Sequence, residues 1–286
     1  MSRRRILPLA VLGLATVAAA PDRSLGQPLL GEYAILGQAR TALRAGVRVT
    51  SGAVGTVGGT LVLGNQVRVS DAVAADTIRL GPDTSAERFF CRFAILSRGG
   101  GVVGGPVVGG GTLPACRAFT PPLVDPALLA PVAVTPGTTD LRVPRRTGTA
   151  PMPAASYGHV VVGKGSLLQL AGGSYTARSI RVAPSGRLVC ADACRIGVLE
   201  RVVLAPRAEL GAGAPLRANQ VRLDIAASGV GQAFRAGARA AVAATIYAPA
   251  GRLALGARGT YHGAYVGRTV TVGPAATVRA DSALGS

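Results

Sequence analysis

The chain has little of the material from which an ordinary globular enzyme core is built. Its 286 residues contain no tryptophan, and aromatic residues make up only 4% of the sequence. Because aromatic side chains supply much of the buried area in most cores, we expect a narrow interior filled by small aliphatic residues. Aromatic platforms for stacking bases are equally scarce, which disfavours sequence-independent binding of single-stranded nucleic acid.

Acidic residues are also few, with 13 Asp and Glu against 31 Lys and Arg and a net charge of +18. Lys164 is the only lysine, so the positive charge is almost entirely arginine. Guanidinium groups make planar bidentate contacts to carboxylates, sulfates and phosphates, although a bias in the coding DNA would give the same composition. Paired carboxylates for cleaving a sugar chain are not evident at neighbouring outward positions, and no phosphate loop or nucleophile motif occurs.

Long apolar runs are absent after the first twenty residues. Residues 1–20 combine a basic head, an apolar stretch from Ile6 to Val17 and a small-residue end at Ala18 to Ala20, the pattern of a secretory signal peptide. No later stretch is long and apolar enough to span a membrane. We therefore expect an exported protein of the periplasm, the cell surface or the extracellular space.

Glycine, in contrast, is abundant, and between its 40 copies lie very short apolar segments. Triplets such as Val160 to Val162, Ile180 to Val182 and Val270 to Val272 recur about every eight residues over 157–286, and a similar rhythm covers 29–98. Strands this short cannot bury a face alone and must stack coil on coil. The sequence predicts an all-β fold, a parallel β-helix or β-solenoid, with glycines at its corners.

Within these segments, apolar and polar residues alternate, as in Val47, Arg48 and Val49, which is typical of half-buried strands. We expect the intervening arginines to point outward and to stack from coil to coil into a basic ladder that binds anionic polymers. The candidate ligand-binding residues are Arg48, Arg68, Arg79, Arg181 and Arg222. Among the acidic residues, Asp192, Asp224, Glu200 and Glu209 are expected to be surface partners of arginines.

Residues 99–156 break the rhythm. Ten of the 19 prolines fall between Pro106 and Pro153, and proline cannot donate to a strand ladder. We interpret this region as a linker or an excursion that caps an open coil end. Within it, Asp125 and Pro126 predict the start of one short helical turn. Open coil ends are otherwise free to self-associate.

The four cysteines are expected to form disulfides, as an even number does in an exported chain. Of three possible connectivities, we favour Cys91 with Cys116 and Cys190 with Cys194. A metal site of Cys190 and Cys194 with His159 or His262 is less favoured, since zinc sites usually have closer cysteine spacing. We predict no metal and no cofactor.

The segments Tyr157 to Val162, Leu170 to Tyr175, Thr245 to Pro249 and Tyr261 to Ala264 resemble a bacterial extracellular β-helix domain of unknown function, some members of which have pilus-assembly-like N termini. Asp281 matches an acidic residue after the last strand of that family. The segment Tyr33 to Leu36, followed by Val49 to Gly55, looks like the opening of ice-binding-type and adhesin β-solenoids.

Together these features predict a non-catalytic exported solenoid that serves as a surface or matrix adhesion or structural module. Its expected partners are anionic polysaccharide, lipopolysaccharide or extracellular DNA. Two alternatives stay open: a polysaccharide lyase or hydrolase on the same scaffold, and an ice-binding-type or self-assembling solenoid. For the enzyme, His159 and His262 recur at similar places in their coils. Tyr175, Tyr247, Tyr261 and Tyr265 are expected to stack as a ladder.

Overall fold

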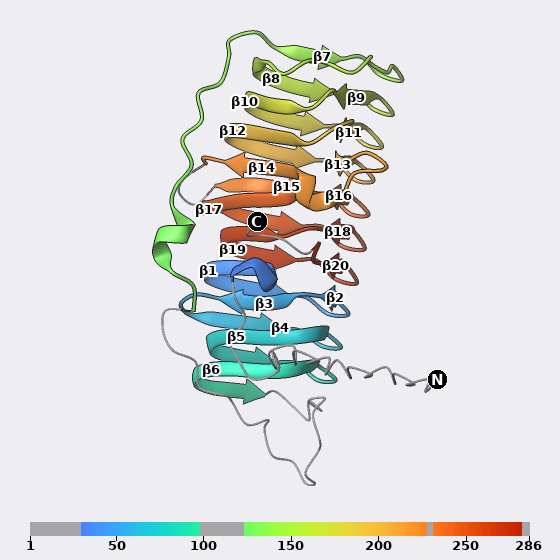
Figure 1. Ribbon diagram of the computed structural model, residues 1–286. Helices are drawn as coiled ribbons and strands as arrows, with labels where there is room; N and C mark the ends of the chain where they lie inside the picture. The colour runs from blue at the N-terminus through green and yellow to red at the C-terminus, as the bar shows by residue number, and fades with distance from the viewer. Residues whose placement is uncertain (1–29, 98–122, 228–230, 282–286) are drawn as a thin grey trace, which may run out of the picture.

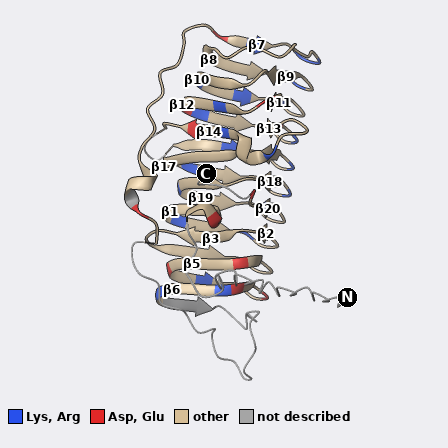
Figure 2. Ribbon diagram, in the orientation of Figure 1, with Lys and Arg blue, Asp and Glu red and all other residues tan. Residues whose placement is uncertain are grey.

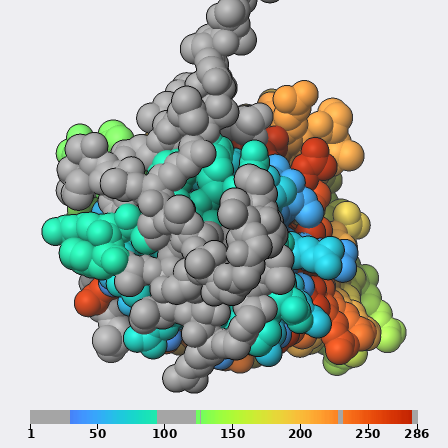
Figure 3. All heavy atoms as spheres, turned by 90° about the horizontal axis from the view of Figure 1, so that it is seen from below, coloured from blue at the N-terminus to red at the C-terminus, as the bar shows by residue number. Residues whose placement is uncertain are grey.

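The computed structural model of the chain describes residues 30–97, 123–227 and 231–281, and in this part the chain is a column of stacked coils (Figure 1). All twenty strands belong to one sheet, and every strand pair is parallel. Seen along the column from the β6 end, early and late segments of the chain project onto one another (Figure 3). The predicted all-β solenoid is confirmed.

The chain enters the column in the middle. The first strands run to one end of the column, in the order β1 (Tyr33–Leu43), β2 (Arg48–Ser51), β3 (Ala53–Thr56), β4 (Thr60–Leu63), β5 (Arg68–Leu80) and β6 (Ser85–Ser97). The upper coils descend from the other end, in the order β7 (Leu141–Val143), β8 (Ser156–Val162), β9 (Leu167–Leu170), β10 (Gly173–Val182), β11 (Arg187–Cys190), β12 (Cys194–Leu204), β13 (Glu209–Ala212), β14 (Val221–Ile225), β15 (Gln232–Ala236), β16 (Ala241–Ala243), β17 (Thr245–Leu255), β18 (Thr260–His262), β19 (Tyr265–Val272) and β20 (Thr277–Arg279). Regular pairing thus begins at β7, inside the region 99–156 that the sequence assigned to a linker.

Each coil has three faces, which we call A, B and C in chain order. Face A contains β3 and β14, face B contains β4, β7 and β15, and face C contains β2, β9, β11, β13, β16, β18 and β20. Long strands such as β10 and β17 run along face A and turn into face B, and their register shifts mark the corner. The side chains that alternate inward fill the interior.

The two ends of the described chain meet in mid-column. Strand β19 pairs with β1, and β20 pairs with β2. A side-chain hydrogen bond follows the same seam, from Ser51 Oγ to the carbonyl of Ala280 at 3.0 Å, across 229 residues of sequence. The first and third parts of the chain therefore form one continuous column.

The interior is mainly aliphatic, but it also holds aromatic rings. Tyr175 and Tyr265 lie in one inward row of face A, whereas Tyr261 lies in an inward row of face C. Tyr261 and Tyr265 meet edge to face, with ring centroids 6.0 Å apart, and burial raises the pKa of both phenols. Tyr247 faces outward on face A, so the predicted tyrosine ladder is wrong.

The turns from face B to face C share one backbone conformation. Their third residue has positive φ and is a glycine only at Gly46 and Gly165 in the described coils. The other coils place larger residues there, at Gln66, Asp83, Arg146, Ser185, Arg207, Arg239, Arg258 and Ala275. The expectation that glycines occupy the strained corners is therefore wrong for most of these turns.

In many of these turns glycine is instead the first residue. At Gly273 an added Cβ would lie 2.6 Å from the backbone nitrogen of Ala257 in the coil above, and at Gly81 it would lie 2.7 Å from that of Asn65. These glycines thus permit close stacking of the turns.

A strap, residues 123–140, runs along the side of the column over face A (left in Figure 1). It contains the short 3₁₀ helix η2 (Pro126–Leu129), at whose start the Ala127 amide donates to the Asp125 carboxylate at 2.9 Å, as the predicted cap. Leu123, Val124 and Leu129 are buried against an outward row of face A that includes Phe90. The described part of the predicted capping excursion therefore covers a side of the column and not an open end.

Tyr247 holds the strap by its hydroxyl group. The oxygen lies 2.9 Å from the carbonyl of Ala130 and 3.2 Å from that of Leu128, and burial raises the pKa of the phenol. Two carbonyls of the strap are thereby satisfied by one donor from face A.

We predict that Tyr247→Phe loosens the strap while keeping the ring packing. The free energy of unfolding should fall by about 1 kcal/mol, the typical net value of a hydrogen bond. Denaturant unfolding and amide exchange over 123–134 measure the effect. Tyr157→Phe is the control, because the Tyr157 hydroxyl has no hydrogen bond to a described residue. Equal exchange in both variants would contradict this role.

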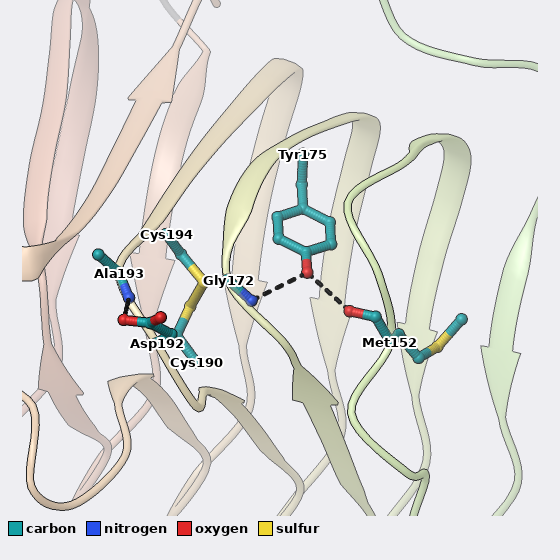
Figure 4. The surroundings of a disulfide bond; sticks show 7 residues. All are labelled: Met152, Gly172, Tyr175, Cys190, Asp192, Ala193 and Cys194. Carbon is teal, nitrogen blue, oxygen red and sulfur yellow. Dashed lines mark hydrogen bonds between the residues drawn. A yellow bond between two sulfur atoms is a disulfide. The ribbon is translucent and has the colours of Figure 1, made fainter.

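One predicted disulfide, Cys190 to Cys194, is confirmed, and it closes the corner between faces C and A. Both cysteines are buried, with Cα atoms 6.2 Å apart. In the coil above, Tyr175 holds the corresponding corner: its hydroxyl donates to the Met152 carbonyl at 2.7 Å and accepts from the Gly172 amide at 3.3 Å (Figure 4). The corner is thus fixed covalently in one coil and by hydrogen bonds in the next.

The second predicted pair is described only in part. Cys91 is disulfide-bonded, and Cys116 lies outside the described residues.

We predict that Cys190→Ala with Cys194→Ala lowers the free energy of unfolding by about 2 kcal/mol, the chain-entropy value for so short a loop. Thermal unfolding of parent and variant, with and without reductant, measures it. Parent and variant should converge under reductant that opens this bond. A variant as stable as the oxidised parent would contradict the prediction.

The proposed signal peptide, residues 1–20, lies outside the described residues. Within the described residues, no helix is long and apolar enough to cross a membrane.

Candidate functional site

The five arginines predicted from the sequence lie on three different faces. Arg48 and Arg68 are exposed neighbours on face C, between Thr277 on one side and Ser85 on the other. Arg79 and Arg181 are exposed on face B, and Arg222 is half-buried on face A. The expected single ladder is therefore wrong, and the stacked pair of Arg48 and Arg68 is the part of it that forms.

Face B carries the largest set of arginines on any one face. Its exposed arginines are Arg40, Arg79, Arg142, Arg181, Arg201, Arg235 and Arg252. In one outward row they alternate with valine from coil to coil: Arg142, Val161, Arg181, Val203, Arg235. Only Arg79 and Arg181 were predicted from the sequence, because the others share no motif with them until the coils are aligned.

The segments of the strands that lie on face B contain no Asp or Glu, although Asp76 and Glu200 directly precede two of these segments. Among the described residues, Arg142 is the one arginine of this set with an ion pair, at 3.6 Å from Asp140, and both side chains are exposed. The backbone amide of His159 donates to the Asp140 carboxylate, which lowers the pKa of Asp140, and Arg142 adds to this effect. Face B is thus a positive surface with little internal compensation.

Arg222 has a different environment from the other four candidates. Its Nε donates to Asp224 at 2.8 Å, Arg195 donates to the other oxygen of Asp224 at 2.7 Å, and the guanidinium of Arg222 lies 5.1 Å from the ring centroid of Tyr247. Asp224 is 1% exposed, which corrects the expectation that it lies at the surface. Arg222 therefore serves this buried carboxylate beside the strap and is not a free anion ligand.

We predict that Asp224→Asn lowers the free energy of unfolding by about 2 kcal/mol. Removing one partner of a fully buried ion pair destabilises a protein by more than this, but here both arginines remain partly exposed to water. Glu209→Gln is the matched control, because its pair with Arg187 at 2.7 Å is about half exposed on both sides and worth little. Urea unfolding compares them, and a similar loss in both variants would contradict the special role of Asp224.

The remaining two of the four acidic residues expected to pair with arginines have different partners. Glu200 lies 3.8 Å from Arg178, an exposed pair of the predicted kind. Asp192 accepts a hydrogen bond from the Ala193 amide within the disulfide corner.

The histidines do not meet. His159 is on face B in β8, where its Nδ1 is 2.8 Å from Ser179 Oγ, and His262 is on face C in β18. His262 and Glu209 line one shallow groove of face C, but they are two coils apart in different rows, and Glu209 is paired with Arg187. The predicted proximity of the two histidines is wrong, and no His and carboxylate meet in this groove.

The described residues contain no cluster of three or more His, Cys, Asp or Glu side chains that could hold a metal ion.

Comparison with known proteins gives one structural similarity. No family matches the chain, and no curated protein sequence matches it. A crystal structure of an ice binding protein from an Antarctic biological consortium is similar over 96% of both chains, with 12% sequence identity and a TM-score of 0.46.

Proposed function

We propose that this chain is an exported, non-catalytic β-solenoid that adheres to anionic polymers at the cell surface or in the matrix, through the arginines of face B. The observation that carries the proposal is the set of seven exposed arginines on face B, of which six have no ion pair with a described residue. An unpaired guanidinium in water keeps its donors available for carboxylate, sulfate or phosphate groups. A regular array of such groups suits a repeating polymer better than a single small ligand.

The state of the acidic residues supports a non-catalytic role. Asp224 and Glu209 are engaged by arginines, and Asp140 accepts the amide of His159. Export is supported by the disulfide between Cys190 and Cys194, because such bonds persist in oxidising compartments.

The charge of face B favours adhesion to polyanions over the ice-binding alternative. Ice binding requires a flat threonine-rich face with little charge. One row of face B contains Thr269, Thr60 and Thr77, but Arg40 lies between the first two and Arg252 precedes them.

We predict that the chain binds immobilised dextran sulfate and does not bind neutral dextran. Counterion release should weaken binding at least about tenfold between about 50 and 200 mM NaCl. Arg181→Gln with Arg235→Gln should weaken binding at least about threefold. Biolayer interferometry over this salt range measures both effects.

The matched control is Arg178→Gln with Arg187→Gln, which removes the same charge from arginines that already have carboxylate partners. It should bind nearly as the parent does. An equal loss of binding affinity in the two variants would show that only net charge matters. Shortening of the polymer during incubation would favour the enzyme alternative.

A further inference from the structure

The turns between faces B and C stack in register along the edge of the column. The backbone amide of Arg207 donates to the carbonyl of Ala238 in the next turn at 3.0 Å, that of Arg239 donates to Ala257 at 2.8 Å, and that of Arg258 donates to Pro274 at 2.9 Å. The third residues of successive turns therefore repeat at the spacing of the strands, about 4.8 Å.

The turn at 183–186 contains no cation, but six exposed cations project from the other five of the six uppermost turns. We call them the turn ridge: Arg145, Arg146, Lys164, Arg207, Arg239 and Arg258. These six turns contain no acidic residue, and none of the six cations has an ion pair with a described residue. Basic residues recur at the turns on the right edge of the column in Figure 2.

The surface along these turns is hollowed into a groove. Lys164, Arg207, Arg239 and Arg258 line it, together with proline and alanine residues of the same turns. The groove therefore combines a row of positive charge with small apolar patches, and it runs along the axis of the column, across the strands.

Arginine is not the residue that this backbone favours. Arg207, Arg239 and Arg258 have φ values of 59°, 58° and 55°, a conformation that L side chains rarely adopt. Glycine occupies the same place at Gly46 and Gly165. The local conformation therefore does not explain why arginine occupies this position in three successive turns. We attribute it to the chemistry of the guanidinium groups, because residues in strained conformations often mark functional sites.

We infer that the turn ridge binds an acidic polysaccharide chain lengthwise, with carboxylates of the polymer opposite the turns that carry a cation. This inference goes beyond the proposed function, which lies on face B, to a second site at the turns, and it rests on the proposed adhesion to anionic polymers. The repeat of about 4.8 Å is close to the length of one sugar in an extended chain. Proline and alanine offer flat apolar contact to the C–H faces of the sugars, while the guanidinium groups bind the carboxylates in bidentate fashion.

Nucleic acid fits the ridge less well. The six upper turns contain no aromatic residue on which a base could stack. Duplex DNA carries one charge about every 1.7 Å, so most of its phosphates would lack a partner on a ridge with at most one or two cations per coil.

The test uses a ridge variant, Arg207→Gln, Arg239→Gln and Arg258→Gln. Glutamine keeps most of the side chain, and Gln66 already occupies the same turn position with φ of 57°. The matched control is Arg178→Gln, Arg187→Gln and Arg279→Gln, which removes the same charge from exposed strand positions that belong neither to the face-B set nor to the turn ridge. Thermal unfolding shows that each variant is folded before binding is measured.

The probes are hexagalacturonate, its fully methyl-esterified form, dextran sulfate and a short DNA duplex, measured by calorimetry at low salt. We expect the ridge variant to bind hexagalacturonate at least about tenfold more weakly than the control variant does. We also expect the two variants to lose similar affinity for DNA, and the methyl ester not to bind the parent.

Each other outcome is decisive for one proposal. Equal loss of hexagalacturonate binding in the two variants, or a ridge variant that loses DNA binding as strongly as hexagalacturonate binding, overturns the inference. A parent that binds dextran sulfate but not hexagalacturonate also overturns the inference and leaves the proposed function standing. A parent that binds no polyanion at all overturns the proposed function.

Discussion

The column depends on one constraint: a strand of three or four residues is stable only with a hydrogen-bonded neighbour in the adjacent coils. In mid-column this neighbour comes from the opposite end of the described chain, where β19 and β20 pair with β1 and β2. Without this seam, two edges would open at once in the centre of the stack. The strap follows from the same arrangement, because the described chain runs from mid-column to the β6 end and resumes its coils at the β7 end, and residues 123–140 lie along the side between the two.

The strap divides the surface into covered and open parts. It buries an outward row of face A, which is why the charged residues beside it, Asp224 and Arg222, are satisfied within the molecule. Faces B and C and their turns have no such cover among the described residues. Parallel stacking then aligns the outward residues of successive coils, so that the arginine excess of the sequence is gathered into positive rows on face B and at its turns.

The sequence was sufficient for the strands and their alternation, because period-two patterns are local. Val47, Arg48 and Val49 have the predicted orientations, and the Cys190 and Cys194 corner forms as expected. The assignment of arginines to faces was not predictable, since loops of different length separate the strands and only the aligned coils reveal the rows. Thus Arg48 and Arg181, similar in sequence context, lie on different faces.

The sequence contains a pattern that marks the turn ridge, although the positions of the glycines do not reveal it. Three tetrapeptides place arginine third between small residues: 205–208 (Ala-Pro-Arg-Ala), 237–240 (Gly-Ala-Arg-Ala) and 256–259 (Gly-Ala-Arg-Gly). Positive φ favours glycine, yet these arginines adopt it.

Each strained arginine costs of order 1 kcal/mol, which a short isolated turn could not tolerate. A stacked turn can tolerate this cost, because hydrogen bonds to the coils on both sides fix its conformation. The stacking that repeats the arginines from coil to coil therefore also compensates for their strained backbone.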